Sequence, residues 1–577
     1  MSISAHEFPK GVLRRELFLG IVSAVSATQI RLNLSVAEQP SGAHFESGRY
    51  GRGEVGELVL VEGQVDLVLA RIVDVRVGEH EQWDLGRNRP APPQDVSGYA
   101  QFLGTVRPDT LRVSAGVANY PRLGDRVYAA PHALVARIPH LMESREADGA
   151  AVELRIGTVS GNSAGEVVVR PEKLFGRHCA VLGATGGGKS WTVARILEEC
   201  LKYKSKLILL DATSEYRGVE GKLILHCHLG SPPKIALGSV PCGVPPSNFT
   251  ESDFIAMFEP AGKVQGPKLR EAMRSLRLLQ LSPSLGSDGV LKKARIHKAS
   301  VEKDLKRHSQ ELENPASPFD ASKLAKQLME ECVFPDGGSS GNPDASTWGG
   351  YNDSDRTFCL PLASRIHALV RSRAFAPVFS AEGLTPLREI MDKFLDEEAR
   401  LLRICLGGVS YEYRAREFIV NAIGRSLLTR ARDGGFADRP VVVFVDEAHN
   451  FLGQKVGYED GAVRMDAFEI VAREGRKYGL NVCLATQRPR DLTEGVLSQI
   501  GTLIVHRLTN DRDREVVERA CGEVDRSSTA FLSNLRQGEA AIIGVDFPIP
   551  MTIKIEPPNQ RPYSDGPDYQ NTWSAPD

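Results

Sequence analysis

The sequence predicts an α/β fold in which a P-loop core follows a small β-barrel and is interrupted by a helical insertion. Three observations predict it: a glycine-rich phosphate-binding motif at 183–190, an apolar strand that ends in two carboxylates at 446 and 447, and short strand-like runs through the first 165 residues. We expect an N-terminal β-barrel over 1–165, a core in two parts over 166–244 and 401–556, a helical insertion over 245–400 and a tail over 557–577.

The composition is that of an ordinary globular protein. The chain has room for about three or four domains, and 42% of its 577 residues are hydrophobic and 25% charged. A formal net charge of −2 gives no global signal for nucleic acid, so such a contact needs a local patch or an internal channel. The nine cysteines form no C-x-x-C pair, and no apolar run reaches the ~18–20 residues that span a membrane. We therefore expect a cytoplasmic protein without membrane contact.

Residues 10–165 are expected to be all-β, because helical periodicity is absent, and short strands at this spacing indicate a small barrel or sandwich. Turn signals separate apolar runs at 17–25, 58–61, 67–77, 104–117 and 126–130. Arg14-Arg15 and the apolar residues after Glu16 resemble a signal peptide, but strand-like alternation continues at 30–34, which favours a first β-hairpin. This domain carries no catalytic spacing. Its role is either assembly and partner docking or purely structural.

The core begins with a phosphate-binding motif. Its glycines let backbone N–H groups point at phosphate oxygens, Lys189 places a cation on the β- and γ-phosphates, and the Ser190 hydroxyl is a ligand for Mg²⁺. An apolar strand at 179–182 and a helix at 192–203 flank the motif, so a chance glycine-rich turn is the weaker alternative. The predicted nucleotide-binding residues are Gly183, Ala184, Thr185, Gly186, Gly187, Gly188, Lys189, Ser190 and Trp191.

A second buried strand at 207–210 ends in Asp211-Ala212-Thr213-Ser214-Glu215. Polar groups at the carboxyl end of such a strand face the ligand crevice, so Asp211 and Glu215 are candidates for the nucleotide site. A turn-capping role for Asp211 is equally compatible with the pattern. The run His226-Cys227-His228 contains metal-ligand types, but neighbouring residues of a strand point to opposite faces, which disfavours a metal site.

The insertion carries no recognisable chemistry. Residues 252–281 have a helical pattern, and 336–355, rich in Gly, Ser, Asn and Asp, are expected to form a mobile loop. The basic run at 292–298 is interpreted as a solvated helix face in preference to a nucleic-acid contact.

The core resumes with a strand at 401–406 and a helix at 417–432, followed by the apolar strand 440–445. Asp446 at its end is predicted to hold Mg²⁺, and Glu447 to polarise the attacking water. Gln487, which ends a later strand, is placed to bond the γ-phosphate or the water. Arg473 and Arg476 close a helix and would reach a neighbouring subunit in a ring; a solvated helix end is the alternative.

Other parts of this half are less informative. The loop 453–461, with Lys455, and Arg464 beyond it are candidates for tracking DNA phosphates in a pore. Runs at 496–500 and 503–505 continue the alternation, and 538–545 is expected to be the last strand. The polar tail after Pro557 is either disordered or a strap across a neighbouring subunit.

Together these motifs resemble the HerA branch of the FtsK–HerA ring ATPases. The resemblance is carried by Gly183–Ser190, Asp211–Tyr216, Asp446–Leu452, Ala472–Gly479, Ala485–Pro489 and Leu508–Asn510. It implies a RecA-like core in a homo-hexamer, ATP and Mg²⁺ sites between subunits, and ATP-driven movement along double-stranded DNA in a central pore. It also implies a phosphate-sensing role for Arg177 and an arginine finger at Arg473 or Arg476, with Arg473 preferred. Ser214 stands where the family usually has glycine.

The resemblance leaves the partner open. Archaeal relatives work with a NurA-type nuclease, and bacterial ones are often paired with a sirtuin-type NADase or a nuclease in anti-phage defence. The slightly acidic chain and its insertion fit the bacterial type better. Since this sequence shows no nuclease or NADase constellation, a separate effector is expected to dock on the N-terminal barrel.

Two functions follow from these motifs. The first is a DNA-translocating ATPase or helicase. The second is a ring scaffold whose ATP binding assembles and activates an effector. A conjugation-type coupling ATPase ranks lower, because the sequence shows no membrane anchor.

Overall fold

The computed structural model describes residues 12–34, 43–45, 48–77, 96–142, 152–160, 165–314, 317–339, 341–380, 383–453, 455–456, 463–521, 531–564, 569 and 573. The fold is mixed α/β with a P-loop core. Its contacts divide the chain into two compact units. The first unit consists of residues 1–203 and 485–577, and the second of residues 204–484.

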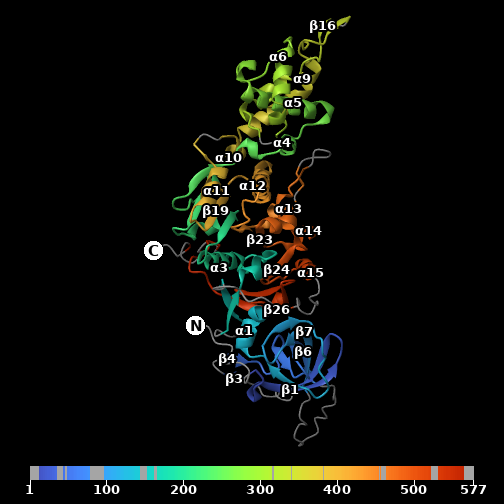
Figure 1. The fold of residues 1–577 in the computed structure, drawn as a ribbon, viewed down its shortest axis with the longest axis vertical. Coiled ribbons are helices and arrows are strands. Elements are labelled where there is room, and N and C mark those ends of the chain that lie inside the picture. Colours follow the sequence, from blue (N-terminus) through green and yellow to red (C-terminus); the bar gives the residue numbers. More distant parts are fainter. Residues whose placement is uncertain are drawn as a thin grey trace, which may run out of the picture. The chain divides into compact units, whose positions relative to one another are not determined.

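A closed β-barrel opens the first unit. Its strands are β1 (Phe18–Val25), β2 (Gln29–Asn33), β5 (Leu58–Val61), β6 (Leu67–Val77), β7 (Val96–Val106), β8 (Val113–Ala115) and β9 (Arg126–Ala129). They pair in the order β2-β1-β9-β5-β6-β7-β8, and β7 also pairs with β2, which closes the ring (Figure 1). Closure leaves no free edge on the ring, and buried residues such as Leu32, Val59 and Ile72 fill its interior. A separate hairpin joins β3 (Ala43–Phe45) to β4 (Gly48–Tyr50).

The expected barrel is confirmed, with two corrections. The first hairpin, β1–β2, forms as expected. The run 104–117 is not one strand, because β7 ends at Val106 and β8 begins at Val113. The region is also not all-β, since α1 (His132–Leu141) follows the barrel although Pro139 lies within it.

The first unit also contains a mixed sheet of the core. Its strands are β10 (Leu154–Val159), β11 (Glu166–Val169), β12 (His178–Leu182), β24 (Ile500–Val505), β25 (Glu539–Gly544) and β26 (Phe547–Ile555). They lie in the order β11-β10-β26-β25-β24-β12, and β12–β24 is the parallel pair. Helices α2 (Pro171–Phe175), α3 (Lys189–Leu201), α14 (Glu494–Leu497) and α15 (Asp511–Ala520) accompany them. On β6, the buried Arg71 donates to the Pro550 carbonyl on β26, and burial lowers the pKa of Arg71 to about 10.

Three expectations for this half were wrong. The strand β10 precedes residue 166 yet pairs with β26, so the core sheet takes a strand from before the expected boundary. Residues 494–497 are helical, and β25 is followed by a further strand, β26. Residues 557–564 of the expected tail lie on α3 of the same chain, whereas the residues beyond 564, apart from Tyr569 and Trp573, lie outside the described residues.

The second unit is built on a parallel sheet. Its strands are β13 (Lys206–Asp211), β14 (Ile224–Gly230), β15 (Val240–Gly243), β18 (Thr385–Pro386), β19 (Leu401–Gly408), β20 (Val441–Val445) and β23 (Leu480–Thr486). The order is β23-β20-β13-β19-β14-β15-β18, and every neighbouring pair is parallel. Helices α11 (Leu387–Asp396), α12 (Ala415–Arg432) and α13 (Ala467–Glu474) belong to this unit. Parallel strands place their carboxyl ends on one edge, which positions the residues that follow β13 and β20.

The insertion is helical, as expected. It contains α4 (Glu251–Phe258), α5 (Gly262–Leu281), α6 (Ala299–Arg307), α7 (Ser309–Glu313), α8 (Leu324–Glu330), α9 (Asp353–Val370) and α10 (Ala376–Phe379), several of which are labelled in Figure 1. The basic run 292–298 is not a helix face; it is an irregular segment in which Lys293 pairs with the buried Glu331. Within the expected mobile loop, β16 (Gly337–Ser339) pairs antiparallel with β17 (Asn342–Asp344).

His226 and His228 lie on β14, and His228 Nδ1 is 2.9 Å from the Ser239 hydroxyl. Burial lowers the pKa of both, that of His226 to about 4. Within the described ranges, no group of three or more His, Cys, Asp or Glu side chains is arranged to hold a metal ion. The same ranges contain no helix that is long and apolar enough to cross a bilayer.

Candidate functional site

The P-loop is built between the buried strand β12 and the N-terminus of α3, both in the first unit. Gly186 (φ +74°) and Gly188 (φ +113°) adopt left-handed backbone conformations that residues with a Cβ rarely adopt. The loop is closed by a hydrogen bond from Gly187 N to Ala184 O (3.0 Å), and Lys189 Nζ donates to the same carbonyl (3.1 Å). A glycine-rich loop that leads into a helix N-terminus is the arrangement that binds phosphate in other proteins.

Gln487 is brought to this loop. It follows directly after β23, and its Oε1 accepts a hydrogen bond from Thr185 Oγ1 (2.5 Å). Thr185 is exposed and Gln487 half-buried. An amide group therefore stands beside the loop where the phosphates of a nucleotide would lie.

His506 underlies the loop and was not among the predicted site residues. It follows β24, is fully buried, and lies against the glycines of the motif: a Cβ on Gly183 would be 2.6 Å from His506 Cβ, and one on Gly188 3.1 Å from Cε1. Its Nε2 is 2.7 Å from Thr192 Oγ1 and its Nδ1 is 2.9 Å from Glu539 O. The rule that polar residues at carboxyl strand ends face the ligand crevice would have found it.

Arg177 is not brought to the P-loop of its own chain. It precedes β12, whereas the P-loop follows the other end of this five-residue strand, about 16 Å away at the usual rise. Its Nε lies 3.7 Å from Asp546 Oδ1. A contact of Arg177 with phosphate would therefore involve another subunit.

In the second unit, Asp211 is engaged in holding the turn after β13. Its carboxylate accepts from the backbone N–H groups of Glu215 (3.2 Å) and Tyr216 (3.1 Å) and pairs with Arg403 Nη2 (2.6 Å). Both side chains of the pair are buried. These contacts agree with the turn-capping role that the sequence left open for Asp211. They also hold the backbone of Glu215 in place at the end of β13.

The structure shows why serine is accepted at position 214, where the family usually has glycine. Its φ of +68° lies in the left-handed region, where glycine is unstrained. The hydroxyl accepts a hydrogen bond from Arg403 Nη2 (3.3 Å). Serine therefore keeps the backbone turn and adds a contact that glycine lacks.

Asp446 and Glu447 follow β20 in the same unit. Asp446 is buried, and its pKa is raised well above the usual range by burial first and then by the neighbouring carboxylates of Asp211, Glu447 and Glu215. Glu447 has a left-handed backbone (φ +47°), and its Oε2 lies 3.3 Å from His449 Nδ1. The two adjacent carboxylates therefore lie in different environments, Asp446 buried and Glu447 half-buried.

The chemistry of these residues fits Mg²⁺. This ion prefers oxygen ligands and usually keeps several waters while bound to one or two carboxylates and to substrate phosphates. Burial is the main cause of the raised pKa of Asp446, and a cation beside it would offset the added repulsion from the neighbouring carboxylates. When bound, Mg²⁺ neutralises charge that develops on the transferred phosphoryl group.

The predicted arginines and DNA contacts are also located. Arg473 and Arg476 are both exposed, and Glu474 between them pairs with Arg432 (2.6 Å). Lys455 in β21 (Lys455–Val456) is opposite Arg464 in β22 (Val463–Arg464). Arg464 also pairs with Glu469 (2.8 Å). The rest of the predicted pore loop, Gln454 and residues 457–461, lies outside the described residues.

Comparison with known proteins gives two family matches. A model described as the central domain of helicase HerA matches residues 154–334, and one described as the helicase HerA-like C-terminal region matches residues 425–543. The DNA double-strand break repair helicase HerA of Pyrococcus furiosus is 37% identical over 116 residues, a fifth of each chain. The probable HerA of Methanocaldococcus jannaschii is 25% identical over 421 residues, 70% of this chain and 76% of that protein.

Among solved structures, the plasmid coupling protein TrwB in complex with a non-hydrolysable ATP analogue is similar with a TM-score of 0.43 and 15% identity. The match covers 75% of this chain and 93% of that one.

Proposed function

Because this chain belongs to the HerA helicase family and is a P-loop ATPase, we propose that it is an ATP-driven translocase of double-stranded DNA. It acts as a homo-hexameric ring together with a separate effector, a nuclease or an NADase. It works in DNA processing or in anti-phage defence, and the effector docks on the N-terminal barrel.

The contact between Thr185 and Gln487 carries this proposal. A loop that binds phosphates needs only N–H groups and a lysine, whereas a motor must also report the state of the γ-phosphate. Gln487 directly follows the core strand β23 and is hydrogen-bonded to the loop, so loss of the γ-phosphate would be transmitted to β23. In the same proposal, Ser190 and Asp446 bind Mg²⁺, and Glu447 polarises the attacking water.

The exposed arginines support action between subunits. Arg473 and Arg476 are exposed at the end of α13 and in the turn after it, so they are accessible to another copy of the chain. A guanidinium placed at a neighbour's γ-phosphate would stabilise charge in the transition state. Arg177, at the strand end away from its own P-loop, is a second candidate for such a contact.

Docking of the effector on the barrel is supported by exposed apolar residues at one rim. Val65 is 69% and Leu123 is 70% exposed. They lie in the turns that follow β5 and precede β9, which are neighbouring strand ends because Val61 pairs with Val127. Large exposed apolar side chains gathered at one end are typical of contact surfaces.

The test is the ATPase rate with and without duplex DNA, and with the purified protein encoded beside this one, for wild type and Glu447→Gln. A several-fold stimulation by DNA that is absent in Glu447→Gln supports the motor. If DNA has no effect, and Glu447→Gln with ATP bound still activates the neighbour, the chain is a ring scaffold and translocation is rejected.

A further inference from the structure

The last strand of the first unit continues into an ordered segment that crosses the P-loop helix. Residues 556–564, here called the strap, follow β26 and form neither helix nor strand. Pro558 and Pro562 are buried, while Glu556, Asn559 and Arg561 are exposed. The family matches end at residue 543, so nothing in them assigns a role to this segment.

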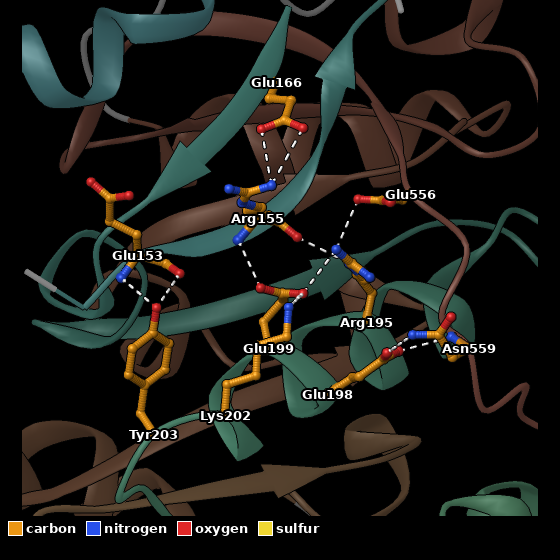
Figure 2. Close-up of polar contacts among 10 residues, drawn as sticks. All are labelled: Glu153, Arg155, Glu166, Arg195, Glu198, Glu199, Lys202, Tyr203, Glu556 and Asn559. Carbon is orange, nitrogen blue, oxygen red and sulfur yellow. Dashed lines mark hydrogen bonds and ion pairs between the residues drawn. The ribbon is translucent and has the colours of Figure 1, made fainter. Parts of the chain in front are cut away.

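Two polar contacts anchor the strap on α3. Glu556 Oε2 pairs with Arg195 Nη2 (2.8 Å), and Asn559 donates from its backbone N–H (2.9 Å) and side-chain amide to the Glu198 carboxylate. Arg195 is itself fixed by Glu199 (2.8 Å) and by the carbonyl of Arg155 (2.9 Å), as Figure 2 shows. The Arg195 guanidinium that binds the strap is therefore held in position by other contacts on and beside α3.

A third contact lies at the phosphate-binding end. The guanidinium carbon of Arg561 lies 5.4 Å from the ring centre of Trp191. Trp191 follows Ser190, the last residue of the motif, and shares one helix face with Arg195 and Glu198 because they are four and seven residues apart. The indole is half-buried, so part of it is covered and part is accessible.

A planar cation stacked on an indole is the surface that nucleobases prefer. Bases stack on aromatic rings and on arginine planes, and tryptophan holds guanidinium groups better than other aromatic residues do. The phosphates of a nucleotide would occupy the N-terminus of α3. Trp191, in the first turn of this helix, is then within reach of the nucleoside.

We propose that Trp191 and Arg561 form the nucleobase wall of the ATP site, and that the strap holds this wall in place. The wall selects purine nucleoside triphosphates, since a purine offers a larger stacking area than a pyrimidine. This proposal rests on the proposed function, which places the phosphates of ATP at the P-loop. It adds the part of the site that binds the base.

The test compares two probes in competition with a fluorescent ATP analogue: ATP, which has a base, and inorganic tripolyphosphate, which has none. Trp191→Ala and Arg561→Ala should weaken ATP binding by about 5- to 100-fold and about 3- to 10-fold, respectively. Tripolyphosphate binding should change less than twofold. Trp191→Phe should restore most of the ATP affinity, and the preference for ATP over CTP should fall in both alanine variants.

The matched control is Arg76→Ala, which removes another arginine stacked on an aromatic ring (6.0 Å from the Tyr99 ring centre) in the barrel. It should leave both probes unaffected. If ATP and tripolyphosphate binding are weakened equally, or neither is weakened, in folded Arg561→Ala and Trp191→Ala, the nucleobase wall is refuted. Failure of Lys189→Ala to weaken either probe would instead refute the phosphate subsite and with it the proposed function.

Discussion

Nε2 of His506 lies 2.7 Å from Oγ1 of Thr192, and both side chains are buried beneath the P-loop. The other ring nitrogen, Nδ1, lies 2.9 Å from the Glu539 carbonyl, which only accepts hydrogen bonds. The proton is therefore on Nδ1, and Nε2 accepts from the threonine hydroxyl. A neutral imidazole thus links the P-loop helix to the strand β25.

This arrangement predicts a pH-dependent stability. Burial, aided by Lys189, lowers the pKa of His506 to about 4. The unfolded chain takes up the proton near pH ~6.5, so the stabilisation is complete above that value and is lost as the pH falls to about 4. The loss is about 3 kcal/mol in all.

Urea unfolding of wild type and His506→Asn between pH 7.5 and 4.5 measures this. At pH 7.5 the wild type should have the larger free energy of unfolding. This difference should shrink by most of the ~3 kcal/mol as the pH falls to 4.5. His367→Asn is the control, because His367 is exposed on α9. Equal pH slopes for wild type and His506→Asn would contradict the neutral, buried state of the ring.

The left-handed conformation of Ser214 predicts an inverted order of substitutions. Ser214→Gly and Ser214→Ala both lose the hydrogen bond to Arg403, but only alanine keeps a Cβ at φ +68°. We expect the glycine variant to be more stable than the alanine variant by about 1 kcal/mol. Denaturant unfolding measures this difference. The control is Ser364, which is exposed on α9, where the alanine variant should be more stable than the glycine variant by a similar amount.

Asp446→Asn should separate stability from activity. The substitution removes a carboxylate whose pKa is raised by burial and by three nearby carboxylates. A raised pKa favours the protonated folded state at low pH, and this stabilisation is lost as the pH rises. The variant should therefore be more stable than wild type at pH 8 without Mg²⁺, by about 1–3 kcal/mol, and the difference should shrink toward pH 5.

Its ATPase activity should fall at least about 100-fold, because an amide is a poor Mg²⁺ ligand. Thermal unfolding at both pH values and a steady-state ATPase assay give the two readouts. Asp438→Asn, on an exposed side chain of the same unit, should change neither. A destabilised Asp446→Asn at pH 8 would show that the carboxylate is satisfied without a cation.

Features encoded by neighbouring residues were predictable from the sequence. The P-loop, its strand and its helix form where expected because glycine conformation, apolar run and helix start are all local. Ser214 could be flagged as unusual but not explained, since its compensation comes from Arg403, almost 190 residues away.

Features that depend on distant partners were missed. The strand β26 contains Pro548 and Pro550, which argue against a strand, yet pairing with β25 and β10 stabilises it. The contact of Arg561 with Trp191 requires that β26 deliver the strap to α3, which no local pattern encodes. The position of His506 after an apolar strand could have marked it as a site residue. Its role in supporting the P-loop depends on its packing against the glycines of the motif, which the sequence does not show.

The hydrogen bond between Thr185 Oγ1 and Gln487 Oε1 predicts a kinetic signature. If Gln487 senses the γ-phosphate, Gln487→Ala should lower kcat about 10- to 100-fold while KM changes by less than about threefold, because the lost interaction belongs to the transition state. Thr185→Val removes the hydroxyl at similar volume and should lower kcat less, because it only releases the amide. Steady-state kinetics of both variants checks these values.

Thr185 and Gln487 should also be coupled. Since Thr185 acts through Gln487, the double variant should be no slower than Gln487→Ala alone, and the two effects should not add. Gln499→Ala is the control, because Gln499 precedes β24 at the end opposite His506 and so lies away from the P-loop. Additive losses in the double variant would mean that the two side chains contribute independently, and Gln487 would then contact the nucleotide without working through the P-loop.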